Sequence, residues 1–396
     1  MQRLYSEKPA LAKEPFAFQE QALVSDCVGW ADFWSVALRK LGYEVDEIVA
    51  NVEPMQRRWA EENGITPDPE SWLLQIVRAR IKAYKPEVLF IHDYITFTAD
   101  FLRELRAECD SIKLVVGWCG AQYSDARVFR EYDIVLSCIP QFVRHFNETG
   151  HRAYHMNHAF EPRILQKLDL SKPPTVDFSF IGSLVLRSQF HLERGKLLRE
   201  LADRSDLRIW SDLIRPSYGQ RSGIAMRRFA YSVVESLQSA GLSREGIMRL
   251  PVLGKVATWD SRPAPLKYIG GAVARRARPA LFGLAMYQQL HDSKVSLNTH
   301  IDASEQSASN MRLYEATGVG TCLLTDSKPN LNDLFEDGKE VVSYVNAEDC
   351  VEKVRYLLEH DAERCEIAQA GQRRTLKDHT FDHRAKQFGE IVGRSI

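Results

Sequence analysis

The stretch NMRLYEATGVGTCLLTD, residues 310–326, indicates a short helix that stops at a glycine and leads into a buried strand. Asn310 is a favourable cap, so we expect the helix to begin near Met311, where free backbone N–H groups attract anions. Arg312 falls in the first turn, where a cation opposes the helix dipole unless an anion lies close by. Glu315 follows three residues later on the same helix face.

Together these groups suit a diphosphate attached to a ribose with two hydroxyls. The N–H groups and the guanidinium can bind the phosphates, and the carboxylate can accept hydrogen bonds from the ribose. An ion pair between Arg312 and Glu315 on a solvated helix face is the alternative interpretation.

An alternation of strands and helices extends outward from this stretch through the second half of the chain. The apolar runs predict strands at residues 175–184, 207–212, 294–300, 321–326 and 340–345. Helical spacing of apolar residues predicts helices at 190–204, 284–293, 310–318 and 348–376. Between about 213 and 280 the pattern becomes irregular, with 12 Lys and Arg against 3 Asp and Glu.

The first half follows the same pattern. We expect strands at 21–25 (QALVS), 44–50 (EVDEIVA), 87–93, 112–118, 133–138 and around 153–160, with helices at 31–42, 72–84, 98–108 and 140–150. This order predicts an α/β protein with two Rossmann-like, doubly wound domains that face each other across a cleft. Ligands of such folds bind at the carboxyl ends of the strands, so we expect the site in that cleft.

The expected domains are residues 1–168 and 175–380, joined by a linker that contains Pro173 and Pro174. A basic insertion at about 213–280 interrupts the second domain. Residues 381–396 are expected to form a C-terminal helix that packs back on the first domain.

The composition is that of a folded soluble protein, with 44% hydrophobic and 27% charged residues among 396. No apolar run approaches the ~18 to 20 residues that a membrane-spanning helix needs, and the first residues lack the apolar segment of a signal peptide. We therefore expect a cytoplasmic protein, either free or peripheral at the inner face of the membrane. The 7 cysteines are scattered and never spaced C-x-x-C, so neither a disulfide framework nor a metal site is indicated.

The net charge of −1 conceals an uneven distribution. Residues 171–280 carry 19 basic and 9 acidic side chains, whereas both flanking segments are acidic. A basic middle segment indicates an anionic partner, such as a phosphate, a lipid headgroup or nucleic acid. A solvated arginine-rich surface is the alternative.

Residues 293–326, followed by LNDLFEDGKEVVSY at 331–344 and the tail at 356–388, resemble the C-terminal domain of GT-B glycosyltransferases. The resemblance is to the group-1 enzymes and, within them, to the branch named after spore-maturation proteins. Residues 175–184, 207–212 and 85–93 extend the resemblance over most of the chain. The basic insertion is not covered by it.

The resemblance implies that Glu315 binds the ribose of a nucleotide-sugar donor and that Ser309, Asn310, Met311 and Arg312 face its diphosphate. Many relatives carry a second glutamate eight positions before the first, where this chain has Ser307. Basic residues after the first strand of the second domain also meet phosphate in the group-1 pattern. The candidates that follow Gly182 and Ser183 are Arg187, Arg194 and Lys196.

In such enzymes the first half holds the acceptor. Polar residues at the strand ends are therefore candidates for the acceptor side, and two aromatic residues could stack on a sugar ring. The predicted acceptor-side residues are Gly29, Asp32, His92, Asp93, Tyr94, Trp118, Tyr123 and His158. Among them, His92 and Asp93 are the strongest catalytic candidates, because a neutral imidazole can take the proton of an acceptor hydroxyl. A capped structural histidine is the alternative.

The chain has no D-x-D pair of the kind that metal-dependent GT-A glycosyltransferases use. We therefore predict metal-independent and cofactor-free glycosyl transfer, with retention at the anomeric carbon favoured by the resemblance. Arg312 would stabilise the departing diphosphate. The acceptor is a saccharide, a lipid-linked molecule or a protein, with peripheral membrane contact through the basic segment and no nucleic acid expected.

Two alternatives stay open at this point. One is a nucleotide-sugar epimerase on the same scaffold, which needs no acceptor. The other is a non-catalytic module that binds nucleic acid or a membrane through the insertion, whose apolar segments contain arginines as interfacial helices do.

Overall fold

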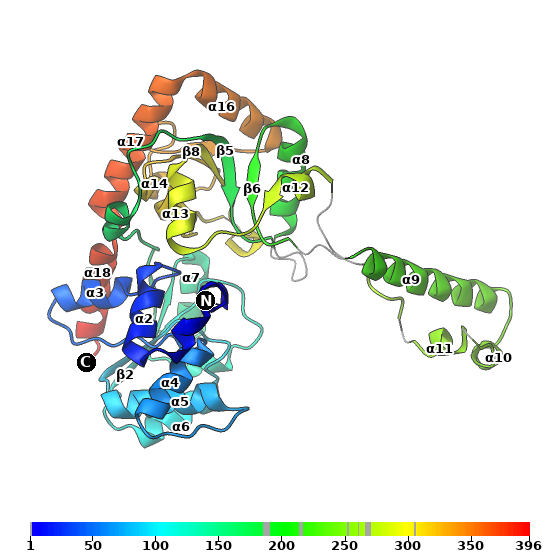
Figure 1. Ribbon diagram of the computed structural model, residues 1–396, viewed down its shortest axis with the longest axis horizontal. Helices are drawn as coiled ribbons and strands as arrows, with labels where there is room; N and C mark the ends of the chain where they lie inside the picture. Colours follow the sequence, from blue (N-terminus) through cyan, green and yellow to red (C-terminus); the bar gives the residue numbers. More distant parts are fainter. Residues whose placement is uncertain are drawn as a thin grey trace.

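The computed structural model describes residues 2–184, 191–213, 217–251, 253–259, 261–265, 271–304 and 306–396. Two lobes, each built around a parallel sheet, are stacked one above the other, and a long helical arm extends to one side (Figure 1). The observed class is therefore the predicted one, α/β with two parallel sheets. Among the described helices, none is long and apolar enough to cross a membrane.

The first lobe contains a sheet of four parallel strands in the order β1-β2-β3-β4. Its strands are β1 (Val88–Ile91), β2 (Leu114–Trp118), β3 (Ile134–Ser137) and β4 (Ala153–His155). The helices and turns around this sheet are α1 (Gln2–Glu7), η1 (Pro9–Lys13), α2 (Phe16–Ser25), α3 (Phe33–Lys40), α4 (Glu53–Glu62), α5 (Trp72–Tyr84), α6 (Ala99–Glu108), η2 (Arg127–Glu131), α7 (Pro140–Glu148) and η3 (Pro162–Lys167). Strands β2 and β3 are buried along their whole length, as expected for parallel strands covered on both faces.

Two strands predicted in this lobe are wrong. Residues 21–25 lie in α2, because the glutamine, alanine and leucine of this segment favour a helix and Leu23 packs beside Val52 and Met55. Residues 44–50 form no regular element. Their polar groups pair elsewhere: Arg80 donates to the Asp46 carboxylate at 3.1 Å, and the Glu47 carboxylate accepts from the Ser35 amide at 2.7 Å.

The second lobe contains six parallel strands in the order β10-β9-β8-β5-β6-β7. They are β5 (Val176–Ile181), β6 (Arg208–Trp210), β7 (Ala277–Arg278), β8 (Ser293–Asn298), β9 (Cys322–Asp326) and β10 (Val342–Tyr344). Around them lie α8 (Leu192–Arg204), α12 (Gly271–Arg276), α13 (Gly283–His291), η4 (Asp302–Ser304), α14 (Arg312–Gly318), α15 (Leu331–Leu334), α16 (Ala347–Glu359) and α17 (Asp361–Asp378). The strands and helices predicted outside the insertion are confirmed here, except that the one helix predicted at 348–376 is two helices, α16 and α17, separated at His360.

The irregular segment after β6 forms the arm, which we define as residues 217–265. It consists of α9 (Tyr218–Ser239), α10 (Arg244–Met248) and α11 (Leu253–Ala257). Helix α9 begins at a capping box between Ser217 and Gln220, and a small core of Val234, Ile247 and Val256 joins the three helices. The chain then returns to the second lobe through α12 and β7, the edge strand of its sheet. The arm is thus an insertion between β6 and β7 that projects away from both lobes (Figure 1).

The final helix, α18 (Phe381–Gly393), lies against α3 of the first lobe. Phe381 and Phe388 pack on Trp34, and Lys40 forms an ion pair with Asp382 at 2.8 Å. Arg384 donates to the carbonyl oxygens of residues 157 and 158 at 3.0 and 3.2 Å. One hydrophobic core, which includes Phe33, Leu136, Phe160 and Tyr314, runs through both lobes.

Candidate functional site

Helix α14 carries Glu315 on a buried face. Its N-cap is Met311, not Asn310, because the Asn310 side chain bonds the Asn298 amide group at 2.7 and 3.2 Å instead. Glu315 is only 5% exposed and forms an ion pair with Arg312 at 2.8 Å. The ion pair that the sequence offered as the alternative to ligand binding therefore exists, but it lies on a buried face of the helix and not on a solvated one.

Tyr287 of α13 also hydrogen bonds Glu315. Burial raises the pKa of Tyr287 well above its ordinary value, and the nearby Glu315 carboxylate raises it further. The phenol thus stays protonated and can donate. Arg312 reaches α13 as well, with its guanidinium 3.2 Å from the sulfur of Met286. Asn310, Met311 and Arg312 remain partly exposed at the start of α14, whereas Ser309 is buried and bonds Ser304.

A second polar cluster lies at the carboxyl ends of β8 and β9. His300 Nδ1 lies 2.7 Å from Asp326 Oδ1, and the same oxygen accepts from the His300 amide at 3.1 Å. Burial raises the pKa of Asp326, but the interactions with His300 and the charge of Lys328 together outweigh it, so the pKa lies below its ordinary value. His300 Nε2 is buried and has no hydrogen-bond partner among the described residues.

Arg194 of α8 lies at the same edge of the sheet, beside the end of β5. Its guanidinium donates to the carbonyl oxygens of Ser183 at 3.0 Å and Thr299 at 2.6 Å, and its Nε has no partner in the described part of the chain. Burial lowers the pKa of Arg194 to about 10. Gly182 and Ser183 follow β5 as predicted, Lys196 is exposed and paired with Glu193, and Arg187 lies outside the described residues.

The acceptor-side candidates of the first lobe divide into two groups. Trp30, His92, Trp118 and His158 form an aromatic cluster at the carboxyl ends of β1, β2 and β4, with the Trp30 ring 4.4 Å from His92 and 5.1 Å from Trp118. The rings of Trp118 and His158 lie 5.1 Å apart. Burial in this cluster lowers the pKa of His158 to about 3. The Trp30 and Phe90 rings desolvate the His92 imidazole and lower its pKa below the ordinary value, although the residue as a whole is exposed. Both imidazoles are therefore neutral near pH 7, and His92 is a weaker base than its residue type suggested.

The remaining candidates make structural contacts. Asp93 accepts from the amides of Ile95 and Thr96, both at 2.9 Å, and Asp32 pairs with Arg163 at 2.9 Å. The Tyr94 hydroxyl donates to a backbone carbonyl at 3.1 Å, and Tyr123 stacks on Phe146 in the core of the lobe. Gly29 has a positive φ of 67° and open space around it.

The loop of residues 26–31 contacts the start of α13, the helix that carries Tyr287. The carbonyl of Asp26 accepts from the Leu284 amide at 2.9 Å, at the start of α13. A Cβ atom at Gly283 would lie 2.0 Å from that carbonyl oxygen, so only glycine permits the approach. The loop also holds Cys27 at φ 55° and Ala31 at φ 40°, conformations that cost about 1 kcal/mol or more for residues other than glycine. A further bridge joins Ser307 to Gln141 of α7 at 2.7 Å.

Sequence reasoning missed four of these residues: Trp30, Tyr287, His300 and Asp326. Both His300 and Asp326 come at or directly after the end of a buried strand, so the strand-end rule applied to the first lobe would have found them. Tyr287 occupies an ordinary core position of an amphipathic helix, so nothing in the sequence distinguishes it from a structural residue. Within the described ranges, no group of three His, Cys, Asp or Glu residues is placed to hold a metal ion.

The chain resembles known proteins both in sequence and in structure. Residues 227–390 match a family model described as "Glycosyl transferase-like". No curated protein matches the chain. The structure of Anabaena Alr3699/HepE in complex with UDP and glucose has 12% sequence identity and a TM-score of 0.51, over 92% of this chain and 96% of that one. A glycosyltransferase from Rickettsia africae ESF-5 has 9% identity and a TM-score of 0.51, over 93% of this chain and 95% of that one. These similarities confirm the predicted two-lobed fold.

Proposed function

We propose that this chain, a glycosyltransferase with the GT-B fold, transfers a sugar from a nucleoside-diphosphate sugar to a hydroxyl group of an acceptor. The observation that carries the proposal is the buried group of Glu315, Arg312 and Tyr287, which adjoins the 26–31 loop of the other lobe. The UDP in the Anabaena complex supports a uridine nucleotide as the first one to test. Membership of the spore-maturation branch stays part of this proposal.

In the proposed reaction the bond between the anomeric carbon and the diphosphate oxygen breaks, and a bond from that carbon to the acceptor oxygen forms. The acceptor hydroxyl passes its proton to an oxygen of the departing diphosphate, and the nucleoside diphosphate leaves with the electron pair of the broken bond. Glu315 accepts from the ribose hydroxyls, and Arg312 stabilises the charge on the leaving group, with Asn310 and Met311 beside it. Transfer proceeds without a metal ion and with retention at the anomeric carbon.

On the acceptor side, Trp30 and Trp118 offer aromatic faces and His92 and His158 offer neutral imidazoles. A neutral imidazole of low pKa binds a hydroxyl group well but takes its proton poorly. We therefore assign His92 to hydrogen bonding of the acceptor. The acceptor itself is a saccharide or a molecule that carries one.

The first test is calorimetry of UDP binding to Glu315→Gln and Glu315→Ala variants. Loss of a buried acceptor group costs about 1 to 3 kcal/mol, so donor affinity should fall roughly tenfold to a hundredfold in Glu315→Ala. The matched control is Glu161→Gln, which alters a carboxylate of the same 5% exposure that also pairs with a nearby arginine, Arg163. Tyr287→Phe separates loss of the phenol from loss of the carboxylate.

Unchanged UDP affinity in Glu315→Ala, with the fold intact by circular dichroism, would count against the assignment. If UDP does not bind the wild type, a thermal-shift screen of GDP, dTDP, ADP and CMP follows, since a ligand at 100 times its Kd adds about 2.7 kcal/mol of stability. Incubation with labelled donors distinguishes transfer from isomerisation. Isomerisation without transfer would favour the epimerase.

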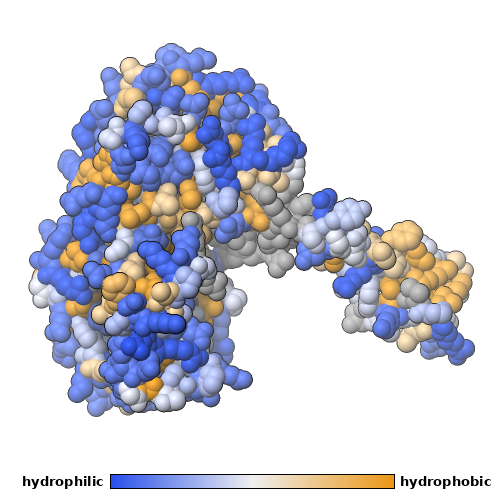
Figure 2. Space-filling model, in the orientation of Figure 1, coloured by the Kyte–Doolittle hydropathy of each residue, from blue (hydrophilic) through white to orange (hydrophobic). Residues whose placement is uncertain are grey.

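We further propose that the arm contacts an anionic membrane surface, which would bring the enzyme to a lipid-linked acceptor. On α9 the side chains of Tyr218, Met226 and Phe229 are 86%, 69% and 71% exposed, and helical spacing places all three on one face. The arm carries 7 Lys and Arg against 3 Asp and Glu. Apolar residues gather over the outer part of the arm in Figure 2. Exposed aromatic and methionine side chains beside arginines are typical of helices that lie in the membrane interface.

A further inference from the structure

A cavity of about 420 Å³ lies at the outer edge of the second sheet, away from the site described above. It is lined by Asp177, Asp206, Arg208, Arg275, Arg276 and Arg278. Asp177, Arg208 and Arg276 lie at or just before the amino ends of β5, β6 and β7. Because Gly182, His300 and Asp326 mark the carboxyl ends of the same parallel sheet, the cavity is distinct from the proposed donor site.

The acidic residues of the cavity leave part of its positive charge unpaired. Asp177 forms an ion pair with Lys294 at 2.8 Å, and Asp206, whose side chain is 100% exposed, lies 3.5 Å from Arg276. In the described residues no ion pair engages Arg208 or Arg278, and both side chains are exposed. These two arginines therefore remain available to a ligand.

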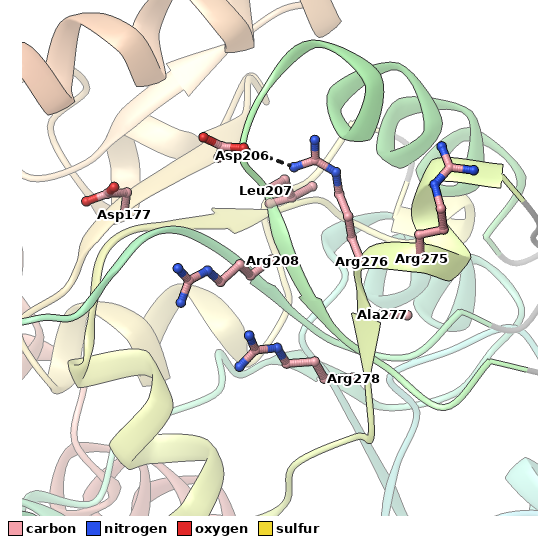
Figure 3. Close-up of a pocket in the computed structure, with 8 residues that line it drawn as sticks. All are labelled: Asp177, Asp206, Leu207, Arg208, Arg275, Arg276, Ala277 and Arg278. Atoms are coloured by element: carbon pink, nitrogen blue, oxygen red, sulfur yellow. Dashed lines mark ion pairs between the residues drawn. The ribbon is translucent and has the colours of Figure 1, made fainter.

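Arg208 and Arg278 lie on neighbouring strands of the sheet, offset from each other by two residues in the register. In the parallel register Ile209 lies opposite Ala277 and Trp210 opposite Arg278, so Arg208 and Arg278 fall on the same face of neighbouring strands. The Arg278 guanidinium lies over the Trp210 ring at 5.3 Å, which fixes its direction. Figure 3 shows both guanidinium groups extending the same way, whereas Arg276 turns toward Asp206 and Arg275 points away.

Long side chains at diagonal positions on one face of adjacent strands still reach each other, so the two guanidinium charges repel and a bound anion removes that repulsion. The planar guanidinium groups can each donate two parallel hydrogen bonds to a phosphate. Protection of a sheet edge by charged residues is the competing explanation. It accounts poorly for Arg208, which lies on β6, inside the edge strand.

We propose that Arg208 and Arg278 form a second anion site, which binds a phosphate or diphosphate group at the outer edge of the sheet. The group is either a free phosphate compound or the headgroup of a lipid. The proposal does not depend on the assignment of the donor site.

The test is calorimetry with inorganic pyrophosphate while saturating UDP fills the donor site. The double variant Arg208→Gln/Arg278→Gln should lose roughly tenfold or more in pyrophosphate affinity and keep its UDP affinity. The matched control is Arg103→Gln/Arg127→Gln, which removes two exposed arginines from the first lobe and so makes the same change in net charge. Sedimentation with vesicles of phosphatidylglycerol or of phosphatidylcholine gives the second measurement.

Loss of pyrophosphate binding in the double variant alone assigns the site to a free phosphate compound. The ligand is a lipid headgroup if the wild type does not bind pyrophosphate and only the double variant loses binding to phosphatidylglycerol vesicles. Equal losses in the control variant, or no difference between the wild type and the double variant with either probe, overturn the proposal. If UDP does not bind the wild type, the donor site is tested with the other nucleotides, and this test runs with pyrophosphate alone.

Discussion

Glu47 shows how burial acts on a single residue of the first lobe. Its carboxylate accepts from the Ser35 amide in the first turn of α3. Burial is the main cause that raises the pKa of Glu47 to about 7, and the nearby Asp32 carboxylate raises this pKa further. The hydrogen bonds from Ser35 and the charge of Arg39 lower it in part. The ionised form is therefore less favourable in the folded protein than in the unfolded chain, whose glutamate pKa is about 4.3.

The sign of the pH dependence follows from linkage. The folded state binds the proton of Glu47 more tightly, so folding stability falls as the pH rises from the unfolded pKa to about 7. Glu47→Gln retains an acceptor and cannot ionise. We expect it to be more stable than the wild type by on the order of 1 kcal/mol at pH 8, and not more stable at pH 4.

Thermal melts across this pH range measure the difference. Glu44→Gln, at an exposed carboxylate three residues earlier, controls for the change in net charge. A constant offset between Glu47→Gln and the wild type from pH 4 to pH 8 would contradict the prediction.

At the scale of elements, α14 joins the site to the interface between the lobes. Its N-terminal half holds Arg312 and Glu315, and its last residue, Gly318, faces Phe160 at the junction where residue 160 pairs with residue 380. A Cβ atom on Gly318 would lie 2.3 Å from the Phe160 ring, which is fully buried. The glycine that marked the helix end in the sequence therefore also permits close packing.

Gly318→Ala should destabilise the protein by about 1 to 3 kcal/mol, because the added methyl group overpacks the core. Denaturant unfolding measures the loss. Gly393→Ala is the control, since a Cβ atom there has nothing within 4 Å and it lies at the end of another helix, α18. Equal stability of the Gly318→Ala variant and the wild type would show that the two lobes shift apart at little cost.

The elements that the sequence predicted well are those whose apolar pattern matches their burial. Strand β9 and helix α14 come from an apolar run and a glycine stop, and local sequence determines both. The predicted strand at 44–50 had a suitable pattern too, but Asp46 and Glu47 make their contacts with Arg80 and Ser35, which are distant in sequence. The sequence places Asp93 at a strand end, but it does not show that the carboxylate accepts a hydrogen bond from the Ile95 amide in a turn. That bond depends on the backbone conformation of the turn, which residue spacing does not determine.

The whole molecule consists of two lobes that share a core and one arm that does not join it. The arm has its own small cluster of Val234, Ile247 and Val256, separate from the two larger cores of the second lobe and the interface. The composition pointed to a basic insertion, but it could not show that 22 residues form one projecting helix. We therefore expect changes to the arm surface to alter binding partners without altering the lobes.

Replacing Met226 and Phe229 together with serine should reduce partitioning onto phosphatidylglycerol vesicles roughly tenfold, because two exposed apolar side chains no longer enter the membrane interface. Flotation of the protein with vesicles measures the effect. The control is Phe18→Ser/Ile95→Ser, which changes two side chains of the first lobe with 55% and 78% exposure. UDP affinity should stay unchanged in both variants.

Equal flotation of the arm variant and the wild type would contradict membrane contact. Self-association in solution that the arm variant abolishes would instead identify a second copy of the chain as the partner. Binding of the wild type to DNA without binding to UDP or vesicles would favour the nucleic-acid module.

Helix α18 has a consequence for the order in which the protein is made. The ribosome synthesises α3 and β1 before the second lobe, yet Phe33, Trp34 and Phe90 are covered by Phe381 and Phe388, which follow the second lobe in the chain. The nascent first lobe therefore emerges with an apolar surface that only later translation can cover. Until then this surface is a natural binding site for a chaperone.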